Sequence, residues 1–217
     1  MRALVIGASG GIGSALCRTL APDVTAVSRR IDGLDVTDEA SLVRVLGGLE
    51  GAFDMIIVAT GALEIAAARP EKTLRALDLA AMTSQFAVNA IGPALVLKHT
   101  LRLLPKDRVA RFAVLSARVG SIGDNTLGGW YSYRAAKAAL NQLIHTAAIE
   151  VQRSHSQAVL ACIHPGTVAT GFTEKYVGSH PTVAPDVAAG HVLAVLAGLT
   201  PADTGGFFDW AGKRIAW

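Results

Sequence analysis

The chain has 217 residues, of which 51% are hydrophobic and 17% charged, and its formal net charge is +3. This composition is typical of a compact folded protein and excludes a disordered chain. The basic residues are scattered and form no run longer than Arg29-Arg30, so we expect no nucleic-acid partner. The two cysteines and six histidines show no ligand spacing, so we expect neither a disulfide framework nor a metal site.

An apolar segment at residues 1–6 runs straight into glycines, so it lacks the longer apolar region of a signal peptide. No other apolar stretch approaches the roughly 18 to 20 residues that cross a bilayer. The richest candidate, residues 188–199, is interrupted by Gly190, His191 and Gly198 and is better interpreted as a core-facing helix. We therefore expect a cytoplasmic protein that does not bind a membrane.

A short apolar run at residues 2–6 has no polar alternation, as expected for a strand that is buried on both faces. A glycine-rich turn follows it, and a helical pattern then continues from Ser14 to Ala21. Glycine lets the backbone approach a ligand closely, and the N–H groups that begin a helix suit a pyrophosphate. The sequence therefore predicts a dinucleotide site at Gly7, Ser9, Gly11, Ile12 and Gly13. The alternative is a tight turn that binds nothing.

The residues after the next predicted strand, 24–27, bear on which dinucleotide binds. An Asp or Glu at this place would bind the ribose hydroxyl of NAD, and neither is present. The guanidinium of Arg29 is suited to pair with a 2′-phosphate instead. We therefore predict NADP(H) in preference to NAD(H), with cofactor residues at Ser28, Arg29, Asp35 and Val36. The alternative is that Arg29 and Arg30 are solvated loop charges.

Helical and strand patterns alternate along the rest of the chain. Helices are expected at about 38–46, 74–104, 133–153 and 186–199, and strands at 53–59, 111–115, 157–163 and 205–210. The segment 74–104 should kink or break at Pro93. The alternation predicts an α/β fold: a Rossmann-type doubly wound parallel sheet, three layers deep (α/β/α), in a single domain over 1–217. We interpret the polar segment 171–185 as a short substrate flap.

The predicted helix around Tyr133 carries the clearest chemical pattern. Tyr133 and Lys137 are four residues apart, so both side chains can point to one face of a helix. A nearby positive charge lowers the pKa of a phenol, and such a group can donate a proton to a carbonyl that accepts a hydride. The alternative is an amphipathic helix with a packed Tyr and a solvent-reaching Lys.

Other candidate residues lie where predicted strands end. Ser116 follows the strand 111–115, and Ala59 and Gly61 follow the strand 53–59. Ligands of open α/β sheets bind beyond these carboxyl ends, so all three are placed for a site. Asn89 lies just before the break predicted at Pro93, and its simplest interpretation is a surface residue.

Together these residues resemble the short-chain dehydrogenase/reductase family over nearly the whole chain. The stretch 130–141 and the tail 207–210 further resemble its C-factor and sniffer-like branch of small NADP-linked carbonyl reductases. The resemblance implies an active-site tetrad of Asn89, Ser116, Tyr133 and Lys137. It also implies that the nicotinamide side of the cofactor is contacted by Pro165, Gly166, Val168 and Thr170, with Tyr133 and Lys137.

The family resemblance implies an NADPH-dependent enzyme that transfers hydride to an aldehyde or ketone. Tyr133 would donate the proton, Lys137 would lower the pKa of Tyr133, Ser116 would bind the substrate oxygen, and Asn89 would fix a backbone bend. The alternative is an NADP(H)-binding sensor with little turnover. An epimerase or dehydratase is disfavoured because the chain lacks the length for a separate substrate domain.

The resemblance also implies a homodimer or homotetramer, joined through the helices that hold Asn89 and Tyr133. Two aromatic residues near the C-terminus, Trp210 and Trp217, are candidates for burial at such an interface or against the substrate pocket.

Overall fold

In the computed structural model, residues 1–176 and 181–217 are described, and six of their strands form one parallel sheet. The strand order is β2-β1-β3-β4-β5-β6. The strands are β1 (Ala3–Ile6), β2 (Val24–Val27), β3 (Met55–Val58), β4 (Ala110–Leu115), β5 (Ala158–His164) and β6 (Gly206–Asp209). The chain crosses from β2 back past β1 to β3, so the sheet is doubly wound, as predicted.

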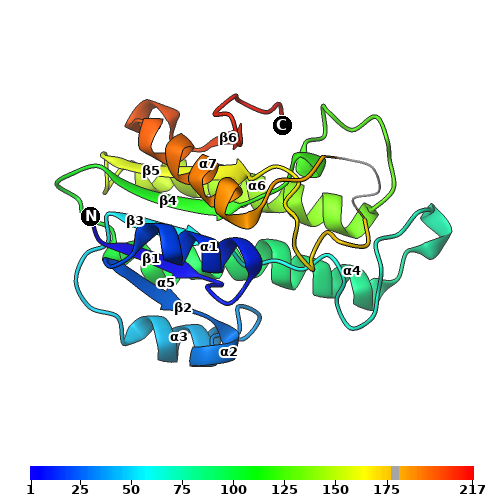
Figure 1. The fold of residues 1–217 in the computed structure, drawn as a ribbon, viewed down its shortest axis with the longest axis horizontal. Coiled ribbons are helices and arrows are strands. Elements are labelled where there is room, and N and C mark those ends of the chain that lie inside the picture. Colours follow the sequence, from blue (N-terminus) through cyan, green and yellow to red (C-terminus); the bar gives the residue numbers. More distant parts are fainter. Residues whose placement is uncertain (177–180) are drawn as a thin grey trace.

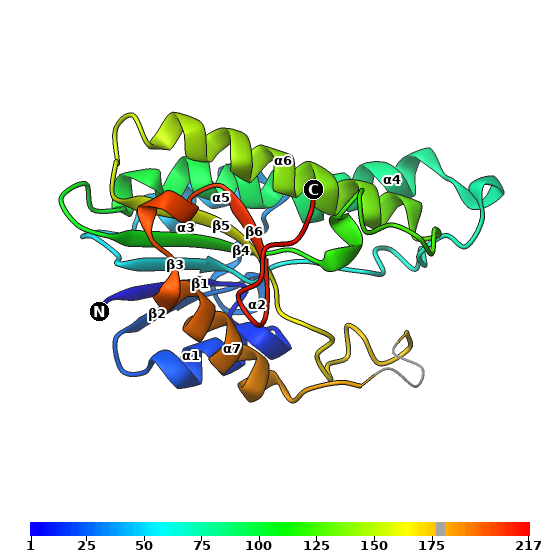
Figure 2. The same ribbon diagram turned by 90° about the horizontal axis from the view of Figure 1, so that it is seen from above.

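Helices cover both faces of the sheet, which gives the predicted three layers (Figure 2). One face carries α3 (Glu39–Gly47), α5 (Gly92–Thr100) and α6 (Tyr131–Val151), and the other carries α1 (Gly11–Leu20) and α7 (Pro185–Gly198). Figure 1 shows α1 and α7 side by side over the sheet.

Strands β1 and β3 are apolar throughout because each of their faces meets a helix layer. In β1, Leu4 and Ile6 belong to the core cluster under α3, α5 and α6. Ala3 and Val5 belong to the cluster under α1 and α7. Alternate residues of a strand point to opposite faces, so the strand has no polar side.

The segment 74–104, predicted as a long helical stretch with a kink or break at Pro93, consists of several shorter helical pieces. A short 3-10 helix covers Leu74–Ala76, and a longer helical run begins only with α4 (Leu79–Phe86). A π-helical turn, Ala87–Ile91, then joins α4 to α5, and Gly92 N–H donates to Ala87 O across it. Pro93 has no N–H to donate to the carbonyl of Asn89, so a regular α-helical hydrogen bond is missing there. The predicted break is therefore a wide turn that contains Asn89 itself.

The helical run Leu79–Leu103 is long and apolar enough, by length and composition, to cross a membrane. This differs from our expectation that no stretch of the chain would be. Its buried residues Ala90, Val96, Leu97 and Leu103 are part of the core cluster between the sheet and helices α3, α5 and α6. A core helix of a compact protein passes the same test, because it too is apolar along one side.

Two smaller predictions need revision. Arg29 and Arg30 begin a short helix, α2 (Arg29–Asp32), whose N-cap Ser28 accepts a hydrogen bond from Ile31 N, so they do not lie in an open loop. The flap predicted at 171–185 includes residues 177–180, which lie outside the described residues. Its final residue begins α7, because Pro is favoured in the first turn of a helix.

Candidate active site

The loops that follow β3, β4 and β5 leave the sheet at the same edge (Figure 2). Strands that run parallel bring their carboxyl ends together, so segments distant in sequence meet there. Ser116 is the first residue after β4, and its N–H donates to Ile163 O of β5 at 2.8 Å. The N-terminal half of α6 lies over this edge and brings Tyr133 and Lys137 to it.

Tyr133 and Lys137 both lie on the buried side of α6, with exposed fractions of 5% and 2%. The Nζ of Lys137 lies 5.8 Å from the centroid of the Tyr133 ring. It donates a hydrogen bond to the carbonyl of Leu115, the last residue of β4, at 2.9 Å. The four-residue spacing therefore places the two groups together, and Lys137 does not reach solvent as in the simpler interpretation.

Burial changes the titration of both groups. It raises the pKa of Tyr133 above its ordinary value, because a buried phenolate would lose its water. The ring centroids of Trp130 and Phe172 each lie 6.2 Å from that of Tyr133. It lowers the pKa of Lys137 to about 8. Our expectation that Lys137 lowers the pKa of Tyr133 is therefore wrong for this structure. Desolvation is the cause of the shift at Tyr133, and desolvation also disfavours the charged form of Lys137.

Asn89 is fully buried, so it is not the surface residue of the simpler interpretation. Its carboxamide accepts from Ala62 N at 3.1 Å and donates to Ala62 O at 2.8 Å. A second donor bond reaches Gln85 Oε1 at 2.7 Å. A Cβ on Gly61 would lie 3.1 Å from Asn89 Oδ1 and 3.7 Å from Lys137 Nζ. Asn89 therefore holds the chain after β3 close beside Lys137.

Ser116 is 5% exposed, and its Oγ donates to Oδ1 of Asn141 at 2.7 Å. Asn141 is a site residue that sequence reasoning missed, although one signal was available. It follows Lys137 by four residues, as Lys137 follows Tyr133, so all three share one face of α6. The polar face of this helix thus points inward toward the carboxyl edge of the sheet.

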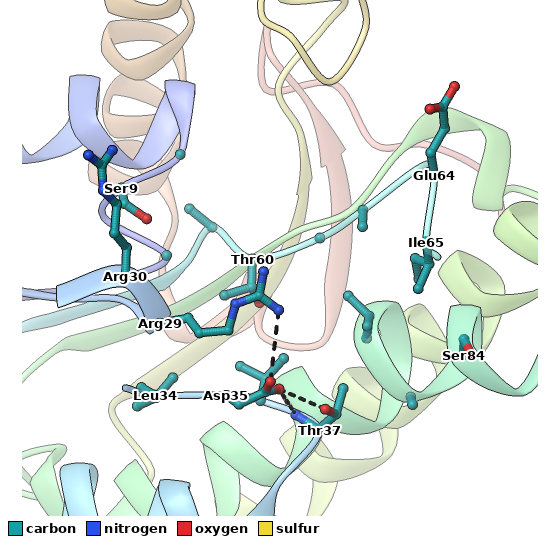
Figure 3. A pocket seen from close by; sticks show the side chains of 18 of the residues that line it. Ser9, Arg29, Arg30, Leu34, Asp35, Thr37, Thr60, Glu64, Ile65 and Ser84 are labelled. Carbon is teal, nitrogen blue, oxygen red and sulfur yellow. Dashed lines mark hydrogen bonds and ion pairs between the residues drawn. The ribbon is translucent and has the colours of Figure 1, made fainter. Parts of the chain in front are cut away.

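A cavity of about 740 Å³ lies beside this edge (Figure 3). Seven of the predicted cofactor residues line it, namely Gly7, Ser9, Arg29, Asp35, Val36, Ala59 and Gly61. The remaining lining residues were not predicted to bind cofactor: Gly10, Arg30, Leu34, Thr37, Thr60, Ala62, Glu64, Ile65, Ala66, Ser84, Ala87 and Val88. Several of these are sequence neighbours of predicted residues, and the helical ones come from the run containing Asn89.

The lining is suited to a dinucleotide. Gly7 has a φ of +89°, and a Cβ there would lie 2.9 Å from the carbonyl carbon of Ala59, so only glycine fits this turn. The N-cap residue of α1, Gly10, lines the cavity, and no side chain of the described residues caps the N–H groups of this helix. The buried Oγ1 of Thr60 also has no partner among those residues. Free donors of this kind suit a pyrophosphate.

Arg29 and Asp35 face one another across the far end of the cavity (Figure 3). Their closest charged atoms, Nη1 and Oδ2, are 3.8 Å apart, and the Arg29 side chain is 79% exposed. Hydrogen bonds from the side chain and backbone of Thr37 lower the pKa of Asp35, and Arg29 adds to this. Arg29 thus points into the cavity, and its ion pair with Asp35 is long and solvent-exposed.

The amino-acid sequence is similar to that of known proteins. A family model described as "Enoyl-(Acyl carrier protein) reductase" matches residues 8–207. The 1-hydroxy-2-glutathionyl-2-methyl-3-butene dehydrogenase of Rhodococcus sp. (strain AD45) is 28% identical over 99% of this chain and 98% of that protein. The chain belongs to the short-chain dehydrogenase/reductase family. The family resemblance expected from the sequence is therefore confirmed.

Two further comparisons fit this family. C-signal of Myxococcus xanthus is 37% identical over 65% of this chain and 81% of that protein. The NADPH-bound carbonyl reductase from chicken fatty liver superimposes with a TM-score of 0.83. That structure is 24% identical and is covered to 94%, and it covers all of this chain. At this identity the likeness shows the fold, which is the short-chain dehydrogenase/reductase fold.

The other residues expected to bind cofactor in this short-chain dehydrogenase/reductase do not line the 740 Å³ cavity: Gly11, Ile12, Gly13, Ser28, Tyr133, Lys137, Pro165, Gly166, Val168 and Thr170. Some of them pack against one another instead. A Cβ on Gly11 would lie 2.5 Å from Thr170 Cγ2, so the segment after β5 lies directly over the start of α1. Val168 is buried and bridges to Val183.

The segment after β5 continues over the start of α6. Phe172 lies against Tyr133, and Tyr176 lies against Trp130 with ring centroids 5.5 Å apart. Glu64, on the loop after β3, accepts hydrogen bonds from Tyr176 Oη and Lys175 Nζ, the latter at 2.9 Å. The described part of the predicted flap therefore covers the catalytic Tyr candidate.

The two C-terminal aromatic residues have different surroundings. Trp210 packs on His191 and beside Gly166, so it lies near the segment after β5. Trp217 stacks on Phe207 and contacts His145 of α6. Each remains 47% exposed. Among residues 1–176 and 181–217, no group of three or more His, Cys, Asp or Glu gathers in a metal-binding arrangement.

A Gly7→Ala variant should lower the free energy of unfolding by about 1–3 kcal/mol, because it forces a side chain into a positive-φ turn against the Ala59 backbone. Urea denaturation measures this. Gly47→Ala is the matched control: it lies in α3 with nothing within 4 Å of its Cβ, so we expect no loss. Equal stability of the two variants would contradict the close approach.

Proposed function

We propose that the protein is an NADPH-dependent oxidoreductase that transfers hydride to the carbonyl of an aldehyde or ketone, with Tyr133 as proton donor. The observation that supports this most is the convergence of Tyr133, Lys137 and Ser116. All three are buried at the carboxyl edge of the sheet, and Gly61 links them to the large cavity. When bound, NADPH would supply the hydride.

The raised pKa of Tyr133 suits the reductive direction. A phenol with a high pKa stays protonated near neutral pH, and the protonated form is the one that can donate to a developing alkoxide. Oxidation of an alcohol would instead require the phenolate, which burial disfavours. Tyr133 therefore acts as a general acid in this proposal.

The neighbouring residues position the substrate and the cofactor. Ser116 places its hydroxyl at the carboxyl end of β4, where it can hydrogen-bond the substrate oxygen as negative charge develops. Lys137 is held by the Leu115 carbonyl and lies near Gly61, so its ammonium faces the cofactor side. Asn89 fixes the backbone at Ala62 and keeps this arrangement together.

The preference for NADP(H) over NAD(H) is proposed from Arg29. An Arg29→Ala variant should weaken NADPH binding by about 10- to 100-fold, since a charge-assisted contact contributes roughly 1.5–3 kcal/mol. NADH binding should hardly change. Titration of both cofactors, followed by nicotinamide fluorescence, measures the two affinities.

The control for this titration is Arg153→Ala, an exposed arginine beyond the end of α6 and away from the cavity. It should leave both affinities unchanged. A wild-type protein that binds NADH as tightly as NADPH would contradict the proposed role of Arg29.

An NADP(H)-binding sensor with little turnover is the second candidate. The observation that favours it is the covering of Tyr133 by Phe172 and Trp130, which leaves the ring 5% exposed. Tight NADPH binding without turnover of a broad panel of aldehydes and ketones would support the sensor and contradict the reductase. A cytoplasmic location and a homodimer or homotetramer, joined through α4, α5 and α6, stay predictions.

A further inference from the structure

The buried face of α6 carries a third polar residue in line with the two catalytic candidates. Tyr133, Lys137 and Asn141 follow one another at four-residue intervals, and Asn141 is only 2% exposed. A buried polar side chain needs hydrogen-bond partners, because it has given up water. Asn141 lies opposite Ser116 and is hydrogen-bonded to it.

The hydrogen bonds of this pair are only half satisfied. The hydroxyl of Ser116 has one hydrogen, and it donates that hydrogen to Asn141 Oδ1 at 2.7 Å. The Nδ2 group of Asn141 is buried and has no partner among residues 1–176 and 181–217. In this arrangement Ser116 has no hydrogen left for a substrate oxygen, while two N–H donors next to it are unused.

We propose that Asn141 is a positioning residue that orients the hydroxyl of Ser116 for catalysis. Half a turn about the Cβ–Cγ bond exchanges the oxygen and the NH₂ group of the carboxamide. Nδ2 then donates to Ser116 Oγ, and the hydroxyl hydrogen is free to donate to the substrate carbonyl oxygen. The unpartnered donor is then satisfied and Ser116 becomes a donor to the reacting atom, while Asn141 Oδ1 gives up the hydrogen bond from Ser116.

This inference rests on the proposed carbonyl reduction, in which Ser116 binds the substrate oxygen. The side chain at position 141 must be able to donate to Ser116, because an acceptor alone there would hold the hydroxyl hydrogen away from the substrate. Asp and Ala substitutions separate these possibilities. Asp keeps the acceptor and the size, whereas Ala removes both donor and acceptor.

The experiment compares kcat and KM of wild type, Asn141→Asp and Asn141→Ala, with NADPH and a reducible aldehyde. We expect kcat to fall about 10-fold or more in Asn141→Asp and by a smaller factor in Asn141→Ala, while KM for NADPH stays constant. Gln142→Glu is the matched control, because it makes the same amide-to-carboxylate change at the next, exposed residue of α6. Thermal melting of every variant reports folding.

A double-mutant cycle assigns the effect to Ser116. In a Ser116→Ala background, Asn141→Asp should cause no further loss of kcat, because the hydroxyl that it holds is gone. An equal loss in both backgrounds would overturn the inference, and so would an Asp variant that is as active as wild type while Ala is impaired. If wild type lacks carbonyl turnover, the proposed function itself fails and the inference fails with it. If wild type turns over but Ser116→Ala keeps full kcat, the inference fails while the carbonyl reduction stands.

Discussion

A Tyr133→Phe variant should lose about 10²- to 10⁴-fold in kcat for carbonyl reduction, the usual contribution of a positioned general acid. NADPH affinity and thermal stability should change little. The substitution removes one hydroxyl and keeps the ring that packs between Trp130 and Phe172. Steady-state kinetics at saturating NADPH measures the loss, and cofactor titration confirms that the variant still binds.

Tyr131→Phe is the matched control for this experiment. Tyr131 is the first residue of α6, is 38% exposed, and lies away from Lys137 in the helical repeat. The same loss of a hydroxyl should leave kcat near the wild-type value there. Full turnover in Tyr133→Phe would exclude the proposed proton donor, whatever the behaviour of the control.

A Lys137→Met variant should lose turnover and gain stability. Burial lowers the pKa of Lys137 from its ordinary 10.5 to about 8 in the folded protein, so the charged form is disfavoured by folding. At 1.36 kcal/mol per pKa unit this disfavours the wild type by about 3 kcal/mol at neutral pH. The hydrogen bond to Leu115 O offsets part of the gain. We expect Met to raise the free energy of unfolding by about 1–3 kcal/mol at pH 7.

The pH dependence provides the decisive check on this expectation. Below pH 8, Lys137 is charged in both states and the full cost is present. Between pH 8 and 10.5 the unfolded chain binds more protons than the folded one, so wild-type stability rises with pH relative to the Met variant. Urea denaturation at pH 7 and pH 10 should show the advantage of Met shrinking. An advantage that is constant with pH would contradict the buried charge.

Much of the architecture follows from local sequence. Short apolar strands with no polar side, such as Met55–Val58, alternate with helical patterns, and the alternation determines a parallel sheet with two helix layers. The spacing of Tyr133 and Lys137 determines that they share a helix face. The glycines at the first turn mark a close backbone approach, since Gly7 has no room for a Cβ. Each of these signals depends on neighbouring residues only, so it can be read from the chain.

The tertiary structure decided the properties that depend on distant neighbours. Pro93 predicts a break in the helix from sequence alone. That the break is a π-helical turn, with Asn89 buried against Ala62, depends on tertiary packing. The raised pKa of Tyr133 comes from burial, and one residue packed on its ring, Phe172, is 39 positions away in the chain. Asn141 contacts Ser116 because α6 crosses the end of β4. The separation of the two residues in the sequence does not predict this contact. Burial and long-range contact set the titration and hydrogen bonding of a site, and both exist only after the chain has folded.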